Sequence, residues 1–230
     1  MEIHALRNKI TLGDSLKIMA EMPAESVGMV ATDPPYGVNF HSGYLKGKGA
    51  RHNKIAGDKN LEWLGGFFTQ AYRVLKQDRM AAVFYGWPNA DKFLAGARKA
   101  GFRLVGHFVW VKPSPGIGYY AMGQHECVFL FAKGSPPQPA IRQSDVVYCK
   151  RMPCEDTNHP TPKPVDLMAQ IIRRYAHEGE IVLDPFAGSC ATAFACRNLG
   201  LDYIAIEISE EWHADAARRM AEVKRQGRLF

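Results

Sequence analysis

Short apolar runs alternate with amphipathic segments along almost the whole chain, and this alternation constrains the fold more than any other feature. Short apolar runs that are bounded by turn residues indicate buried strands. We expect strands over 27–32, 80–87, 102–112, 125–133, 180–184 and 202–207. We expect helices over 15–22, 61–76, 89–100, 164–179, 189–200 and 208–227. Strands that alternate with helices are typical of an α/β layered fold.

The length of 230 residues suits a single domain over 1–230. No apolar run approaches the roughly 20 residues that cross a bilayer, and the N-terminus lacks a signal-peptide pattern, so we expect a cytoplasmic protein without membrane contact. The five cysteines show no disulfide spacing, which favours reduced thiols. Cys149, Cys154 and His159 lie close together but lack the spacing of a zinc site, so we expect no metal.

Two stretches interrupt the alternation: residues 37–60, rich in glycine and basic residues, and residues 133–158, rich in proline and polar residues. Long loops in compact domains are often functional. A formal net charge of +6 is compatible with a polyanionic partner. We therefore treat both loops as candidate nucleic-acid-contacting segments, with solvated basic loops as the alternative interpretation. The candidate nucleic-acid-binding residues are Lys46, Lys48, Arg51, His52, Lys54, Arg142, Lys150 and Arg151.

Asp33, Pro34, Pro35 and Tyr36 directly follow the apolar run over 27–32. The two prolines fix the backbone and lack N–H groups, so carbonyl oxygens here are free to accept hydrogen bonds from a ligand. The carboxylate of Asp33 adds an acceptor, and the ring of Tyr36 adds a flat stacking surface. These groups would suit a clamp for an amino group on a planar ring. A structural turn with a packed tyrosine is the alternative interpretation.

A second turn, 184–189 with the sequence DPFAGS, lies between an expected strand and an expected helix. Small residues in such a turn let the backbone approach a ligand, and an acid after the next strand, here Glu207, can bind both hydroxyls of a ribose. The G-x-G-x-x-G fingerprint and the P-loop lysine are absent, which disfavours a dehydrogenase. The combination favours an adenosine-type cofactor without a pyrophosphate. The alternative is a structural corner followed by an exposed glutamate.

Three motifs together, DPPY at 33–36, HPTPKP at 159–164 and FAGS at 186–189, resemble the amino DNA methyltransferases that use S-adenosylmethionine, the N6-adenine and N4-cytosine family. The resemblance covers nearly the whole chain. The catalytic motif precedes the cofactor motif, which is the circularly permuted order of the beta group of that family. The resemblance implies a Rossmann-like methyltransferase fold with a mostly parallel twisted sheet and helices on both faces. It also implies double-stranded DNA as substrate, restriction–modification or phage biology in bacteria, and compatibility with a homodimer.

The resemblance implies a role for each motif residue. Asp33 and the carbonyl of Pro34 would hold the exocyclic amino group of a flipped-out base, Pro35 would complete the turn, and Tyr36 would stack on the base. The residues implied to bind the cofactor are Asp14 at the adenine amino group, Glu207 at the ribose, Ile208 on the adenine face, Thr161 and Lys163 at the methionine carboxylate, and Asp184, Phe186, Ala187, Gly188 and Ser189 on the methionine side.

Cys190 departs from the family pattern, which usually has glycine after FAGS. We expect its side chain to narrow the turn or shift the start of the helix without preventing cofactor binding.

The target base is the least constrained inference. A DPPY motif resembles adenine-N6 members more than cytosine-N4 members, in which SPPY is common, so we expect adenine-N6 methylation. Members of the family often carry a target-recognition insert, so the resemblance implies that 37–60 and 133–158 are the candidate DNA-contacting or target-recognition segments. Both are short, which favours a short or relaxed target sequence. Cytosine-N4 methylation is one alternative. Methylation of RNA or of a protein amide by the same clamp is a second, and a non-catalytic nucleic-acid-binding module is a third.

Overall fold

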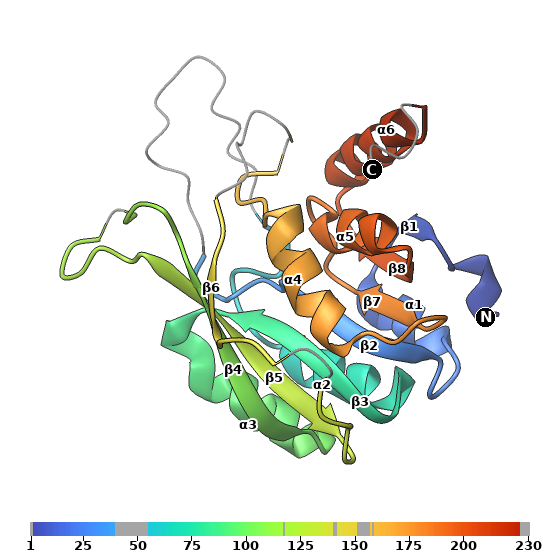
Figure 1. The fold of residues 1–230 in the computed structure, drawn as a ribbon, viewed down its shortest axis with the longest axis horizontal. Coiled ribbons are helices and arrows are strands. Elements are labelled where there is room, and N and C mark those ends of the chain that lie inside the picture. The colour runs from blue at the N-terminus through green and yellow to red at the C-terminus, as the bar shows by residue number, and fades with distance from the viewer. Residues whose placement is uncertain are drawn as a thin grey trace.

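An eight-stranded sheet in the order β1-β8-β7-β2-β3-β5-β4-β6 forms the centre of the computed structural model (Figure 1). The structure describes residues 2–39, 55–116, 118–139, 142–150, 157 and 159–225. The strands are β1 (Lys9–Leu12), β2 (Val27–Thr32), β3 (Leu75–Tyr85), β4 (Arg103–Val111), β5 (His125–Lys133), β6 (Val146–Tyr148), β7 (Ile181–Asp184) and β8 (Asp202–Glu207). Only β5 runs antiparallel to its neighbours β3 and β4 within the described sheet. The predicted mostly parallel α/β sheet is therefore confirmed.

Helices cover both faces of this sheet, as predicted (Figure 1). Successive residues of β2 point to opposite faces of the sheet: Met29 belongs to one buried apolar cluster and Val30 to the other. The first cluster includes residues of α4, α5 and α6, and the second includes residues of α1, α2 and α3. The helices are α1 (Ser15–Glu21), α2 (Leu64–Val74), α3 (Ala90–Ala100), α4 (Val165–Tyr175), α5 (Ala191–Leu199) and α6 (Glu210–Arg225), with short 3-10 helices η1 (Ile3–Ala5) and η2 (Trp87–Asn89).

Several boundaries differ from the sequence prediction. The segment 75–79 forms the start of β3 rather than the end of a helix, because Leu75 pairs with Val27 of β2. Helix α4 ends at Tyr175 instead of 179, because Ala176 adopts an extended conformation and residues 177–179 have no apolar side chain to continue the buried stripe of the helix.

The segment 133–158, expected to be a loop, contains β6, which pairs with β4 and buries Val147. Among the described residues, no helix is long and apolar enough to cross a membrane.

The two central strands end side by side and create the crevice of the fold. β2 and β7 are parallel neighbours; the chain leaves β7 for β8 on one side and leaves β2 for β3 on the other. Such a point of reversal opens a crevice at the carboxyl ends of the strands. The hydroxyl of Thr32 donates to Oδ1 of Asp184 at 2.6 Å and joins the two strand ends. Burial raises the pKa of Asp184 to about 6.

Candidate active site

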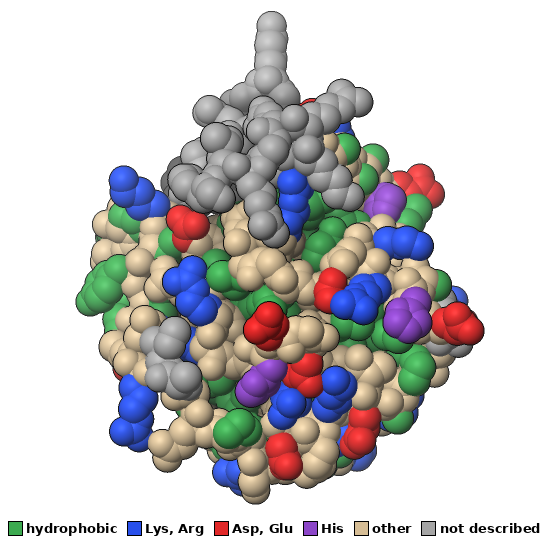
Figure 2. All heavy atoms as spheres, turned by 45° about the vertical axis from the view of Figure 1, so that its right-hand side comes forward, with side chains coloured by type: hydrophobic (Ala, Val, Ile, Leu, Met, Phe, Trp, Pro, Cys, Tyr) green, Lys and Arg blue, Asp and Glu red, His purple; other side chains and the backbone are tan. Residues whose placement is uncertain are grey.

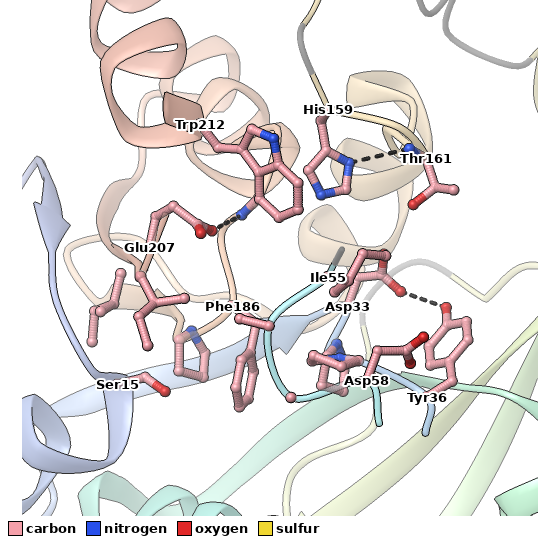
Figure 3. A pocket seen from close by; sticks show the side chains of 18 of the residues that line it. Ser15, Asp33, Tyr36, Ile55, Asp58, His159, Thr161, Phe186, Glu207 and Trp212 are labelled. Carbon is pink, nitrogen blue, oxygen red and sulfur yellow. Dashed lines mark hydrogen bonds between the residues drawn. The ribbon is translucent and has the colours of Figure 1, made fainter. Parts of the chain in front are cut away.

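A cavity of about 480 Å³ lies at the carboxyl ends of β2 and β8. Figure 3 shows Glu207 and Asp33 on opposite sides of this cavity, with Phe186 between them and His159 above. A smaller pocket of about 30 Å³ shares Asp33, His159 and Gly188 with it and extends toward Asp184. The motifs at 33–36, 159–164 and 186–189, far apart in sequence, therefore border one continuous site.

The turn after β2 is fixed from several directions. The hydroxyl of Tyr36 donates to Oδ1 of Asp33 (Figure 3). The amide of Asn89, at the end of η2, donates to the carbonyl of Tyr36 at 2.8 Å. The backbone N–H of Gly37 donates to the buried carboxylate of Asp58 at 2.8 Å. These contacts hold the Asp33 carboxylate and the Tyr36 ring in one orientation at the edge of the cavity.

A buried lysine links Asp33 to a second carboxylate. Nζ of Lys163 lies 2.5 Å from Oδ2 of Asp33 and 3.0 Å from Oε2 of Glu126. Nζ of Lys112 lies 2.5 Å from the other oxygen of Glu126. The side chain of Lys163 is only 8% exposed, so the two carboxylates replace the hydrogen bonds and the charge stabilisation that water would give an exposed ammonium group.

The charge states of this cluster follow from burial and pairing. Burial lowers the pKa of Lys163, but Asp33 and Glu126 raise it by more, so the pairing favours the ammonium form of Lys163. Burial raises the pKa of Glu126, but Lys163 and Lys112 bring it down to about 2. Burial raises the pKa of Asp33 above its usual value, and Lys163 opposes that shift. The cluster keeps a carboxylate acceptor inside a partly desolvated site.

The 186–189 turn approaches the cavity with its backbone. Gly188 has a φ of +48°, and its N–H donates to Oε2 of Glu207 at 2.6 Å. A Cβ atom on Gly188 would lie 2.9 Å from Nε2 of His159. Oε1 of Glu207 accepts from the N–H of Ser209 at 2.8 Å. Glycine is therefore required here both by the backbone conformation and by the space.

Most predicted cofactor residues meet at this site. Those that line the main cavity are Asp14, Thr161, Lys163, Phe186, Gly188, Glu207 and Ile208. Asp184, Ala187 and Ser189 line the smaller pocket instead. Asp14 also caps α1, accepting from the N–H of Leu16 at 2.9 Å.

The residues present fit an adenosine-type cofactor. Ile208 remains 54% exposed although it lines the cavity, so an apolar surface is open to a planar ring. A carboxylate keeps spare lone pairs after two backbone contacts, which leaves Glu207 able to accept from hydroxyl groups. The N–H of the Trp212 indole is buried in the wall of the cavity without a protein acceptor among the described residues.

Sequence reasoning missed several residues of the site. Glu126 and Lys112 flank the β4–β5 connection, and the acid at the start of an otherwise apolar strand was the available signal. His159 was named as a weak zinc candidate and as the first residue of the HPTPKP motif, but it was given no role of its own. Its ring packs edge-on against Trp212, and its Nδ1 accepts from the N–H of Thr161 at 3.3 Å. Asp58 gave no signal beyond its place in a polar segment.

The expected nucleic-acid-binding residues fall largely outside the description. Lys46, Lys48, Arg51, His52, Lys54 and Arg151 lie outside the described residues. Arg142 and Lys150 are exposed. On the face that Figure 2 presents, the described Lys and Arg side chains are interspersed with Asp and Glu rather than gathered in one patch.

Cys190 precedes α5 in the left-handed region at a φ of 61°, a conformation that favours glycine. Its side chain is buried in the core and lines neither the cavity nor the smaller pocket, so the turn is not narrowed at the ligand side.

Comparison with known proteins places these features in context. A family model described as DNA methylase matches residues 27–218. The chain is 39% identical over 213 residues to the putative methylase YubD of Escherichia coli (strain K12), which covers 93% of this chain and 90% of that protein. It is 28% identical over 247 residues to the DNA adenine methyltransferase YhdJ of the same organism, covering 90% of this chain and 81% of that protein.

Solved structures share the fold. The M1.HpyAVI–SAM complex has a TM-score of 0.73 at 23% identity and covers 96% of this chain and 99% of its own. The cytosine-N4-specific PvuII DNA methyltransferase also has a TM-score of 0.73, at 22% identity, and covers 92% of this chain and 85% of its own.

Proposed function

This chain belongs to the family of N6/N4 DNA methylases, and we propose that within it the chain transfers a methyl group from S-adenosylmethionine to the N6 amino group of adenine in duplex DNA. The observation that carries this proposal is the position of Asp33. Its carboxylate is held by Tyr36 and Lys163 at one side of a cavity whose other side carries Glu207 and the Gly188 turn. An amino-group acceptor and a nucleoside-type cradle thus face the same space.

The residues of the clamp would act by orientation and by proton acceptance. S-adenosylmethionine supplies, when bound, an electrophilic methyl group on a sulfonium. Glu207, the Gly188 turn and Ile208 would hold the adenosine part of the cofactor, and Thr161 and Phe186 would border its remainder. Asp33 and the carbonyl of Pro34 would accept hydrogen bonds from the amino group, which directs its lone pair away from them. Fixing the reactants in this way supplies much of the rate in a direct displacement.

Asp33 does not need to be a strong base before the reaction. The amino nitrogen becomes acidic only as the new N–C bond forms, and Asp33 lies where the released proton would be accepted. Lys163 favours the ionised form of Asp33, so the acceptor is ready although burial raises its pKa. Because a stacked base cannot reach a recessed carboxylate, the base would have to leave the duplex, with Tyr36 as its stacking partner.

Adenine is favoured over cytosine by two observations. The motif begins with Asp33 rather than serine, and the similar protein YhdJ is a DNA adenine methyltransferase. The alternative is cytosine-N4 methylation, because the PvuII enzyme of similar fold is cytosine-N4-specific. Target recognition is assigned in this proposal to the segments 37–60 and 133–158, whose small size favours a short or relaxed recognition sequence.

The test is transfer of labelled methyl groups to unmethylated duplex DNA, followed by hydrolysis to nucleosides. Wild type is compared with Asp33→Asn, which keeps the shape of the side chain but removes its charge. N6-methyladenine from wild type and its loss in the variant would support the proposal. N4-methylcytosine would contradict the choice of base, and transfer only to RNA or protein would contradict the substrate class.

A further inference from the structure

We propose that the tip of the β4–β5 connection, residues 118–122, is an aromatic wedge that contacts the bases of duplex DNA beside the extruded nucleotide. The inference rests on the proposed function in that duplex DNA is the substrate and that the target base leaves the duplex. The DNA-contacting segments expected from the sequence were 37–60 and 133–158. The wedge lies in neither.

The tip exposes three large apolar side chains. Tyr119 is 95% exposed, Tyr120 is 97% exposed and Met122 is 61% exposed. The two tyrosine rings meet edge to face with centroids 4.9 Å apart. Residues 113–124 contain no acidic and no basic side chain. Exposed apolar side chains that are contiguous on a soluble protein mark sites of interaction.

Paired backbone carries this tip away from the sheet. The last strand pair is Val111 with His125, and beyond it the N–H of Lys112 donates to the carbonyl of Gln124 at 2.8 Å. Further out, the N–H of Gly116 donates to the carbonyl of Gly123 at 2.8 Å. A Cβ on Gly118 would lie 1.8 Å from the carbonyl oxygen of Ala121, so the tip turns as tightly as glycine allows. The tyrosines are thus presented by a hairpin extension.

The base of the hairpin is part of the active site. Lys112 and Glu126, on either side of the connection, both line the cavity, and Glu126 pairs with the lysine that holds Asp33. Figure 1 shows the connection, in green, projecting as an arm from the body of the molecule. The arm therefore starts at the cavity and extends outward from it.

The chemistry of the tip suits bases rather than phosphates. Neutral side chains gain nothing from the backbone charge of DNA, whereas aromatic faces stack on bases of any sequence. Extruding a nucleotide unstacks its neighbours, and proteins that unstack DNA commonly insert apolar side chains at that step. Tyr119 and Tyr120 could occupy the exposed faces of those neighbours while the extruded base lies against Tyr36.

The experiment compares wild type with the double variant Tyr119→Ala/Tyr120→Ala in the full chain. The affinity for unmethylated mixed-sequence duplex is measured by fluorescence anisotropy over a series of salt concentrations, with S-adenosylmethionine binding measured by calorimetry. The variant should bind duplex at least about fivefold more weakly, the lower bound for one base–aromatic stack. The slope of affinity against salt should not change, because no phosphate contact is lost. The affinity for S-adenosylmethionine should also be unchanged.

A matched control removes exposed apolar surface elsewhere. Val105→Ala changes a side chain that is 41% exposed and lies near the beginning of β4, at the opposite end of the strand from the hairpin, and it should leave DNA affinity unaltered.

Unchanged duplex affinity in the double variant would overturn the wedge, as would a weaker affinity accompanied by a reduced salt slope. A change in oligomeric state with DNA affinity retained would also overturn it, because the tip would then contact a second copy. If wild type binds and methylates duplex DNA while the double variant does so equally, the wedge alone fails. If wild type binds no duplex, the proposed function fails with it.

Discussion

Lys163 and Asp33 are 130 residues apart in sequence, yet Nζ of the lysine lies 2.5 Å from Oδ2 of the aspartate and is almost completely buried. The HPTPKP segment therefore supplies the countercharge of the DPPY segment. The resemblance assigned Lys163 to the carboxylate of the cofactor, and the two roles predict different consequences of its removal.

Lys163→Met should lower methyl transfer mainly through the ionisation of Asp33. Without the ammonium, the neighbouring Glu126 carboxylate and burial both raise the pKa of Asp33 further. The ionised acceptor then requires a higher pH, so the acid limb of the kcat profile should move to higher pH. On the acid limb, where kcat follows the ionised fraction of Asp33, each unit of upward pKa shift lowers kcat about tenfold. The loss should diminish as the pH rises beyond the limb. The measurement is kcat against pH at saturating S-adenosylmethionine.

Lys112→Met is the matched control, because Lys112 pairs with Glu126 but does not contact Asp33. Its acid limb should move less. An unshifted profile in Lys163→Met, together with weakened cofactor binding, would assign Lys163 to the cofactor carboxylate instead.

Gly86→Ala should displace Tyr36. A Cβ at residue 86 would lie 2.9 Å from Cβ of Tyr36, too close for both backbones to remain in place. Misplacing a reactant by about 1 Å can cost roughly 100-fold in rate, so we expect kcat to fall by up to that factor while S-adenosylmethionine still binds. Gly65→Ala is the control, since nothing lies within 4 Å of its new Cβ and alanine favours the α2 helix. Equal activity in the two variants would contradict the role of this contact.

Gly188→Ala should weaken cofactor binding. The variant introduces both a side chain at positive φ and a Cβ 2.9 Å from His159, and it disturbs the N–H that donates to Glu207. The disturbed turn would displace Glu207, the proposed acceptor for the cofactor hydroxyls. Loss of one hydrogen bond from a hydroxyl to that carboxylate would cost about 1.5–3 kcal/mol, so Kd for S-adenosylmethionine should rise by about tenfold or more in calorimetry.

Gly200→Ala separates strain from ligand contact. Gly200 also has positive φ, +70°, but no atom lies within 4 Å of its added Cβ. Alanine there should lower stability by about 1–2 kcal/mol and leave cofactor affinity unchanged. Retained affinity in Gly188→Ala would show that the turn is not a cofactor contact.

His159 should make the protein less stable on acidification. Burial lowers its pKa to about 3, so the folded protein keeps the ring neutral where the unfolded chain takes up a proton. Its contribution to stability is therefore present above pH 6.5 and is lost as the pH falls toward 3. His159→Asn, which keeps an acceptor near the N–H of Thr161, should reduce the loss of unfolding free energy between pH 7.5 and 5 by up to about 2 kcal/mol. Urea unfolding at each pH measures it, and parallel pH dependence in the two proteins would contradict the assignment.

The sequence predicted elements wherever a buried surface is encoded locally. The run 125–133 became β5 with the predicted bounds, and Gly101 ends α3 in the left-handed conformation. The placement of Asp33 and Glu207 at strand ends followed from the same pattern, because each acid ends an apolar run.

Pairings between distant segments were not predictable from periodicity. Glu126 lies beside Lys163 because β5 is antiparallel, so the beginning of that strand, rather than its end, lies at the cavity. Strand β6 was missed because a run of three residues carries too little pattern, and its pairing with β4 depends on an edge that only the assembled sheet provides.

The reversed direction of β5 also determines where this architecture can grow. A connection between parallel strands must run back along one face to the other end of the strands, so extra residues there tend to be tied to the crossover helix. The β4–β5 connection starts and ends at the same end of the two strands, so its length can change without altering any strand pair. Insertions or deletions between Lys112 and His125 would give proteins with one catalytic centre but different reach across the DNA, and chimaeras exchanged at these two positions should keep the fold.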